Sequence, residues 1–169
     1  DIAPGFNRSF TCETWDWVDP AIFEKVRNEA EAKADYDVEL DICGSDVDGR
    51  MIEVARANAE EVGLGDSITF KQLALKDFTT EKEYGVMVAN PPYGERLGEE
   101  ESVRRLYKEM GHVFRPLTTW SKYILTSDLA FEEYYGAKAT KKRKLYNGAL
   151  RTDLFQYWGT RPPRKPRED

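Results

Sequence analysis

The stretch Gly85-Val86-Met87-Val88-Ala89-Asn90-Pro91-Pro92-Tyr93 decides the fold of this chain. Its first five residues form an apolar run, which is typical of a buried strand. Two consecutive prolines cannot continue a strand, because each lacks a backbone N–H and has its φ angle fixed. The sequence therefore predicts that the chain leaves a sheet rigidly here. Asn90 is then held at the carboxyl end of the strand, the edge at which open α/β sheets bind ligands.

Strands alternate with helices on both sides of this stretch. Helix starts are indicated by a capping residue followed by proline, as in Asp19-Pro20, and helix ends by glycine, as at Gly63 and Gly136. Expected helices cover 20–30, 48–62, 100–114 and 128–135; expected strands cover 38–43, 67–73, 85–89, 122–126, 142–146 and 150–158. Two of the helices have a predicted apolar face: Ile22, Phe23, Val26 and Ala30 in the first, and Val103, Leu106, Tyr107, Met110 and Val113 in the helix 100–114. Asn147-Gly148 joins the last two strands and is a hairpin signal. The pattern predicts an α/β fold with a mainly parallel, Rossmann-like sheet and an antiparallel edge hairpin.

The bulk composition describes an ordinary globular domain. The chain has 169 residues, of which 40% are hydrophobic and 33% charged, so one domain with a sizeable core is expected. No apolar run approaches the ~20 residues needed to span a bilayer, and no leader opens the chain. Cys12 and Cys43 indicate neither a disulfide framework nor a metal cluster, and the apolar run around Cys43 predicts a buried thiol. We expect a cytoplasmic protein without metal or membrane partners.

The net charge of −6 hides an asymmetry. Residues 138–169 hold ten Lys/Arg and three acidic residues, a balance of +7, so the remainder carries −13. The basic end could bind phosphates, whereas the acidic body is a poor surface for a polyanion. The run Lys141-Lys142-Arg143-Lys144 has a second interpretation, an edge strand protected by lysines. Residues 161–169 are predicted to form a basic, disordered tail.

Asn-Pro-Pro-Tyr after a buried strand resembles the active-site motif of S-adenosylmethionine-dependent methyltransferases acting on exocyclic amines of nucleobases. The resemblance implies that the Asn90 side-chain oxygen and the Pro91 carbonyl accept N–H bonds from the amine and aim its lone pair at the methyl group. Asn90, Pro91, Pro92 and Tyr93 are thus the expected catalytic residues. Tyr93 also offers a face on which an extruded base can stack. The alternative is a rigid surface turn.

An acidic residue at the end of the second strand of a doubly wound fold binds the ribose hydroxyls of a nucleoside cofactor. Asp46 fits this place, because it follows an apolar strand and precedes a helix. Asp48 is the rival, but its spacing suits the N-cap of that helix better. The expected cofactor is S-adenosylmethionine, bound by Asp46, Val47 and Asn90.

A nucleoside-binding α/β domain normally begins with a strand and a glycine-rich turn. The only Gly-x-Gly here, Gly63-Leu64-Gly65, follows a helix and leads into a strand, which is the wrong context. We therefore expect a sheet that lacks its first strand and glycine-rich loop. In the usual order that strand would lie between the strands ending at Cys43 and Ala89. Residues 1–169 alone should then bind S-adenosylmethionine poorly.

Four runs resemble the bacterial guanine-N2 methyltransferases of large-subunit ribosomal RNA: 1–8, 44–48, 57–59 and 90–97. The resemblance extends to about Trp158. It implies that residues 1–160 form a methyltransferase domain, the carboxyl-terminal portion of a longer protein with an RNA-binding domain upstream. Arg96 would then bind an RNA phosphate or pair with Glu95 or Glu99. Two alternatives remain: adenine-N6 methylation of DNA, and a non-catalytic fragment that only docks to RNA or a partner.

Overall fold

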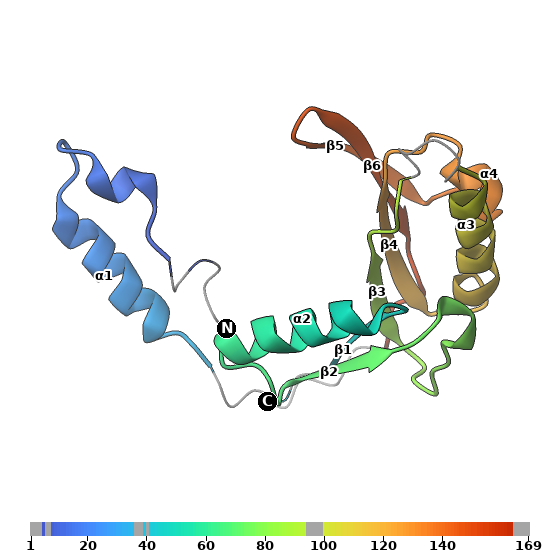
Figure 1. Cartoon of the computed structure of the whole chain (residues 1–169), viewed down its shortest axis with the longest axis horizontal. Helices are drawn as coiled ribbons and strands as arrows, with labels where there is room; N and C mark the ends of the chain where they lie inside the picture. Colours follow the sequence, from blue (N-terminus) through green and yellow to red (C-terminus); the bar gives the residue numbers. More distant parts are fainter. Residues whose placement is uncertain (1–4, 6–7, 36–38, 40, 94–99, 164–169) are drawn as a thin grey trace. The chain divides into compact units, whose positions relative to one another are not determined.

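The computed structural model describes residues 5, 8–35, 39, 41–93 and 100–163. Figure 1 labels its helices and strands. Contacts divide the chain into two units. Unit 1 comprises residues 1–44 and 56–69, and unit 2 comprises residues 45–55 and 70–169.

Unit 2 contains a four-stranded sheet. Its order is β3 (Gly85–Ala89), β4 (Trp120–Thr126), β6 (Leu150–Tyr157) and β5 (Lys141–Asn147). β3 pairs with β4 in parallel, while β6 is antiparallel to both β4 and β5. The sheet confirms the predicted α/β fold, with parallel strands at one side and an antiparallel hairpin at the other edge. The strand 85–89 has the predicted bounds, but the prediction that it is buried is wrong. None of its residues is buried, and Val86 and Val88 are exposed, because no described element covers that face of β3. β4 begins two residues before the predicted start.

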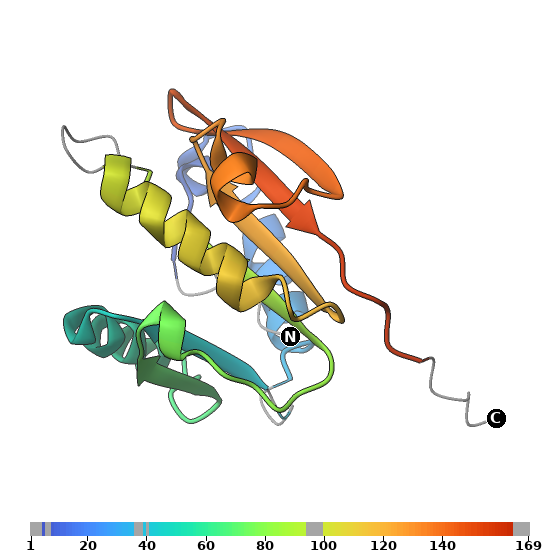
Figure 2. The same cartoon turned by 90° about the vertical axis from the view of Figure 1, so that its right-hand side faces the viewer.

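Two helices cover one face of this sheet, α3 (Glu100–Phe114) and α4 (Phe131–Tyr135), as Figure 2 shows. The predicted apolar stripe of α3 packs into the core. The buried core consists of Val103, Tyr107, Met110, Phe114, Ile124, Phe131, Tyr135, Phe155 and Tyr157. The ring of Phe131 lies at its centre, edge-on to Tyr107 with centroids 4.9 Å apart, and 4.9 Å from the ring of Phe155. Aromatic contacts between helices and sheet therefore hold unit 2 together.

The contact between the two helices depends on a glycine. A Cβ atom at Gly111 of α3 would lie 2.1 Å from the Tyr135 carbonyl oxygen, where no side chain fits. α4 begins three residues later than predicted, because residues 128–130 form a turn instead. In that turn, the Ala130 N–H donates to the Asp128 carboxylate, 2.8 Å away.

The β5–β6 hairpin differs from the prediction by one residue. Asn147 pairs with Leu150, so the turn is Gly148-Ala149 rather than Asn147-Gly148. The φ angle of Gly148 is +61°, which suits the first central position of a type II′ turn, where glycine is required. β5 forms seven pairs with β6 and is two residues longer than the predicted strand 142–146.

In unit 1, α1 (Pro20–Glu31) follows the 3-10 helix η1 (Thr11–Thr14). Asp19 caps α1 as predicted, with its carboxylate accepting a hydrogen bond from the Ala21 N–H at 3.0 Å. None of the α1 residues is buried, and the side chains of Ile22 and Val26 on its predicted apolar face are exposed. The α1 helix thus has the predicted sequence signals but no covering partner among the described residues.

A second, two-stranded sheet consists of β1 (Ile42–Asp46) and β2 (Ile68–Gln72), with α2 (Gly49–Glu61) between them in sequence. The boundary between the two units runs through these three elements. β1 ends at Asp46, three residues later than predicted. Gly63 has a φ angle of +74° and follows α2, in agreement with its predicted role as a stop.

The prediction of a buried Cys43 thiol is wrong, because Cys43 is exposed. β1 pairs with β2 alone among the described strands, and four of its five residues are exposed. No strand of the described ranges joins β1 to β3, so the two sheets are separate, as expected for a sheet without its central strand.

No helix in the described ranges is long and apolar enough to cross a bilayer.

Candidate functional site

The Asn-Pro-Pro-Tyr motif begins at the carboxyl end of β3, directly after Ala89. Asn90 is exposed, whereas Pro91 and Tyr93 are half-buried. The Tyr93 hydroxyl donates a hydrogen bond of 2.7 Å to the Asn90 side-chain oxygen. The Asn90 Oδ1 atom therefore points toward Tyr93 and already accepts one hydrogen bond. An amide oxygen has a second lone pair, so it can accept another N–H.

A second tyrosine anchors the motif from α3. The Tyr107 hydroxyl donates to the Pro92 carbonyl at 3.3 Å and lies 2.8 Å from the Thr126 hydroxyl at the end of β4. Tyr107 and Thr126 are both fully buried. Burial raises the pKa of Tyr107, the Thr126 hydrogen bond opposes this, and the nearby Asp128 and Tyr93 add to it. The Tyr107 hydroxyl therefore stays protonated at neutral pH and remains a donor.

Sequence reasoning missed both anchors. Tyr107 was assigned to the apolar stripe of α3, and Thr126 only marked a strand end. One signal pointed to Thr126: it ends β4, which is parallel to β3, so it lies at the same carboxyl edge as Asn90.

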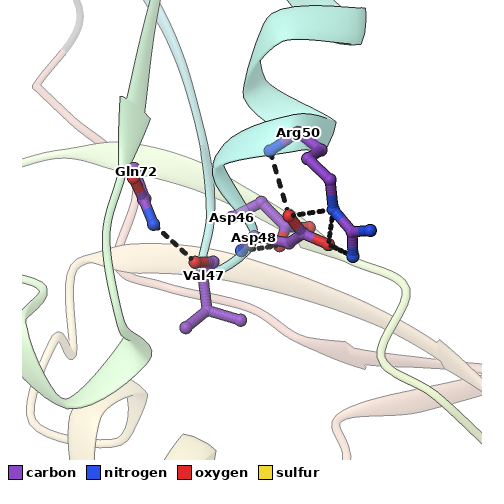
Figure 3. A network of polar contacts seen from close by, with 5 residues as sticks. All are labelled: Asp46, Val47, Asp48, Arg50 and Gln72. Carbon is purple, nitrogen blue, oxygen red and sulfur yellow. Dashed lines mark hydrogen bonds and ion pairs between the residues drawn. The ribbon is translucent and has the colours of Figure 1, made fainter.

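Asp46 lies at the end of β1, beside the start of α2 (Figure 3). One of its carboxylate oxygens, Oδ1, accepts the Asp48 N–H at 2.8 Å, and its backbone carbonyl accepts the Leu73 N–H at 2.9 Å. The side chain is thus fixed through one oxygen. Among the described residues no hydrogen bond is seen to the other oxygen, Oδ2, and the residue is exposed. Asp46 can therefore accept hydrogen bonds from a ligand hydroxyl.

Both carboxylate oxygens of Asp48 are bound by Arg50. Its Oδ1 accepts the Arg50 N–H at 3.0 Å, as expected of an N-cap, and its Oδ2 lies 2.7 Å from Arg50 Nη2. The hydrogen bonds from the Arg50 side chain and backbone lower the pKa of Asp48. This arrangement favours Asp46 over Asp48 as the ligand-binding carboxylate.

Gln72, at the end of β2, is a residue that sequence reasoning missed. Its side-chain amide donates to the Val47 carbonyl at 3.1 Å (Figure 3). It also lies close to Gly49, where a Cβ atom would stand 2.9 Å from Gln72 Oε1. Gln72 therefore fixes the backbone between β1 and α2, while the Val47 side chain stays 68% exposed.

The predicted site residues form two groups. Asn90, Pro92 and Tyr93 are linked with Tyr107 and Thr126, and Asp46 and Val47 are linked with Asp48 and Gln72. No hydrogen bond joins the two groups in the part of the chain that the structure describes. Arg96 lies outside the described residues. Among the described residues no three His, Cys, Asp or Glu side chains form a possible metal site.

Comparison with known proteins gives consistent results. Residues 1–156 match the family described as the RMKL-like methyltransferase domain. The chain is 58% identical over its full length to the "Putative RNA methyltransferase YpsC" of Bacillus subtilis (strain 168), of which it covers 44%. It is 38% identical over 155 residues, 89% of its length, to the "Ribosomal RNA large subunit methyltransferase K/L" of Shewanella baltica (strain OS185), of which it covers 22%.

A solved structure has the same fold. The crystal structure of SMU.472, described as a putative methyltransferase complexed with SAH, superposes with a TM-score of 0.86 at 58% sequence identity. The match covers 96% of this chain and 43% of that one. The chain thus spans less than half the length of each of these relatives.

Proposed function

Since the chain belongs to the RMKL-like methyltransferase domain family, we propose that it transfers a methyl group from S-adenosylmethionine to the N2 amine of a guanine in large-subunit ribosomal RNA. Its similarity to the K/L enzyme supports the ribosomal RNA substrate. One observation carries the reaction class. The Asn90 oxygen stands at the carboxyl end of β3 and accepts a hydrogen bond of 2.7 Å from a neutral donor, as it would from an amine.

The motif activates the amine by positioning it. The lone pair of an exocyclic amine is delocalised into the ring, so the amine is a poor nucleophile. Two acceptors, Asn90 Oδ1 and the Pro91 carbonyl, can bind its two N–H groups and turn the lone pair toward the methyl group. As the nitrogen becomes positive its N–H groups become stronger donors, so the acceptors stabilise the transition state more than the ground state. No covalent enzyme intermediate is needed.

The group around Asp46 fits the ribose of the cofactor. Asp46 is exposed and fixed through Oδ1, and its Oδ2 accepts no hydrogen bond from the described residues, so it can accept one from a hydroxyl. Val47 follows with its backbone held by Gln72 and its apolar side chain exposed for contact with a flat base. S-adenosylmethionine, when bound, supplies an electrophilic methyl group. Asn90 is the residue that we assign to both the cofactor and the amine.

Tyr93 and Arg96 are the proposed contacts to RNA. The Tyr93 ring would stack on the extruded guanine. When the amine binds, the Tyr93 hydroxyl either keeps its hydrogen bond to the Asn90 oxygen or gives it up. If the bond is kept, the amine N–H donates to the second lone pair of that oxygen. Arg96 would bind a phosphate. A ribosomal RNA substrate would place the protein in the cytoplasm.

The β5 strand offers further phosphate contacts. All of its residues are exposed, and it lies at the edge of the sheet. Lys142 is paired with Glu132 at 2.9 Å. Because side chains alternate along a strand, Lys141 and Arg143 point to the opposite face. An edge strand protected by lysines explains their exposure equally well, so a binding measurement has to decide.

The reaction is tested by identifying the methylated nucleoside. The full-length protein, isotope-labelled S-adenosylmethionine and unmodified large-subunit ribosomal RNA are incubated together, and the digested nucleosides are separated. We expect labelled N2-methylguanosine. Labelled N6-methyladenosine, from this RNA or from DNA, would favour the adenine alternative. Absence of any labelled nucleoside from a folded protein that binds RNA would favour the non-catalytic alternative.

The basic strand is tested by the salt dependence of RNA binding. Lys141→Gln together with Arg143→Gln should reduce the slope of log K against log salt by about one for each lost phosphate contact. Lys25→Gln on α1, where the side chain is also exposed, serves as the control. An unchanged slope would leave the protected edge strand as the explanation.

A further inference from the structure

The hydroxyls of Tyr107 and Thr126 form a hydrogen-bonded chain with a fixed direction. The Pro92 carbonyl carries no proton, so its contact with Tyr107 at 3.3 Å requires the Tyr107 hydroxyl as donor. Tyr107 has only one hydroxyl proton, so at its 2.8 Å contact with Thr126 it must accept. Thr126 is therefore the donor there, and its oxygen accepts the Asp128 N–H at 3.2 Å. The chain runs from the backbone at Asp128 through Thr126 and Tyr107 to Pro92.

This hydrogen-bonded chain provides one of the few anchors that the motif can have. Pro91 and Pro92 lack N–H groups, so only their carbonyls can be held by hydrogen bonds. Tyr107 takes the Pro92 carbonyl, while no hydrogen bond to the Pro91 carbonyl is seen among the described residues. The anchor thus separates the two carbonyls. The Pro92 carbonyl is bound by Tyr107, whereas the Pro91 carbonyl accepts no hydrogen bond from the described residues and can accept one from a ligand.

We propose that Tyr107 and Thr126 are positioning residues for methyl transfer. By holding the Pro92 carbonyl, they set the direction of the Pro91 carbonyl and of the Asn90 side chain, the two acceptors of the amine. The proposal rests on the proposed function of the motif. Neither residue touches the substrate, because both are fully buried. Each acts through the backbone of the motif.

The first test is Tyr107→Phe in the full-length protein. The ring and its contact with Phe131 remain, and only the hydroxyl is lost. We expect kcat to fall by about 10- to 100-fold, because small misplacement of reacting groups can cost on the order of 10²-fold. The cofactor dissociation constant should not change. A normal kcat, or a raised KM with a normal kcat, would overturn the proposal.

Tyr157→Phe is the matched control. Tyr157 belongs to the same core, and its hydroxyl also donates to a backbone carbonyl, that of Ala137 at 3.1 Å. The substitution removes a comparable hydrogen bond away from the motif. It should lower the melting temperature but leave kcat near normal. An equal loss of kcat in both variants would show a general effect of core stability and overturn the proposal.

The direction of hydrogen-bond donation, from Thr126 to Tyr107, gives a second test. Thr126→Val keeps the shape of the side chain but removes the donor to Tyr107, so kcat should fall as in Tyr107→Phe. Thr126→Ser retains the hydroxyl and should restore most of the activity. Equal kcat values for Thr126→Val and Thr126→Ser would contradict the proposed hydrogen bond from Thr126 to Tyr107.

A crystal structure of the Tyr107→Phe variant tests the anchor without turnover, and so separates this proposal from the proposed function. The Pro91–Pro92 backbone should shift or lose order. An unchanged motif would overturn the anchor, whatever base the protein methylates.

Discussion

The two sheets of this molecule differ in how well they are packed. The four-stranded region, which we define as β3–β6 with α3 and α4, contains the nine residues of the buried core. The two-stranded region, β1 and β2 with α2, contributes only Ile52 and Ala59 to the buried apolar residues. The motif at Asn90 is thus anchored to a dense core through Tyr107, whereas Asp46 lies on a sheet of two strands, which is marginally stable in water by itself.

The difference separates the two tasks of the proposed site. The Asn-Pro-Pro-Tyr motif, the proposed amine site, is held by rigid prolines and by the buried Tyr107 hydroxyl, which Thr126 orients, so it is preorganised. Asp46, the proposed ribose ligand, is held by a local contact with the Asp48 N–H and by the Leu73 N–H, which follows β2. Chemistry should therefore depend mainly on the four-stranded region and cofactor affinity on the two-stranded region.

The largest expected effect comes from Asn90→Ala in the full-length protein. Loss of one positioning acceptor should reduce the rate of methyl transfer on the order of 10²–10³-fold, as removal of an oxyanion donor does in other enzymes. The fold should survive, because Asn90 is exposed. Single-turnover methylation of ribosomal RNA measures the effect, with circular dichroism as the check on folding. Near-normal turnover would remove Asn90 from the mechanism.

The comparison predicts a weak cofactor site in residues 1–169 alone. β1 and β3 lie in separate sheets in the described residues, so the edge between their carboxyl ends is not supported by a shared ladder. The dissociation constant for S-adenosylmethionine should be on the order of 1 mM or weaker, a binding free energy of about −4 kcal/mol or less in magnitude. Calorimetric titration and thermal melting measure it. Micromolar affinity with a raised melting temperature would contradict the conclusion that residues 1–169 alone bind the cofactor weakly.

Asp46→Ala in the full-length protein should weaken cofactor binding by about 10- to 100-fold, since a hydrogen bond to a charged group contributes roughly 1.5–3 kcal/mol. Ribose hydroxyls keep their charge in the transition state, so kcat at saturating cofactor should change little. Asp48→Ala is the control. It removes the cap and the Arg50 pair, and should destabilise α2 more than it affects binding at low temperature. Equal dissociation constants for wild type and Asp46→Ala would exclude Asp46.

The smallest effect is alkaline destabilisation, and it should arise in the four-stranded region. Burial raises the pKa of Tyr135 to about 12, opposed in part by Arg115, and burial also raises the pKa values of Tyr107 and Tyr157. An unfolded tyrosine ionises near pH ~10. The stabilisation is therefore fully present below about pH 10 and is lost as the pH rises toward the folded values.

We expect the melting temperature to fall by several degrees between pH 9 and pH ~11, since ~1 kcal/mol corresponds to roughly 2–4 °C in a domain of this size. Tyr135→Phe should reduce this fall, whereas Tyr146→Phe, at an exposed position of β5, should not. Melting followed by tyrosine absorbance and circular dichroism measures the difference. If the melting temperature of the Tyr135→Phe variant fell by the same amount, the alkaline destabilisation would arise from groups other than Tyr135.

Local sequence signals predicted the elements well where one signal acted alone. The apolar run before two prolines gave β3 with its observed bounds, and the stripe of α3 gave both ends of that helix. Asp19 marked the start of α1 and Gly63 the end of α2. Both signals depend only on neighbouring residues: the Asp19 carboxylate accepts the Ala21 N–H, and Gly63 adopts a positive φ angle. Predictions failed where a distant partner decides the outcome. Cys43 is exposed because no described element covers β1, although its own apolar neighbours predicted burial.

The site shows the same division. Asn90, Tyr93 and Asp46 could be selected from a short motif and from a strand end. Tyr107 and Thr126 could not be selected as anchors in this way. Tyr107 contacts Pro92 across 15 residues, and Thr126 contacts Tyr107 across 19 residues, separations that local patterns do not encode. Gln72 reaches Val47 across 25 residues in the same way.

The exposure of Cys43 has a practical consequence. An exposed thiol on β1 can be modified with a fluorescent or spin label. Its reaction rate with a maleimide would follow, in real time, any covering of β1 by cofactor, by RNA or by another segment of protein. Cys12 is the only other thiol in the chain and is partly buried, so Cys12→Ser would leave a single reporter.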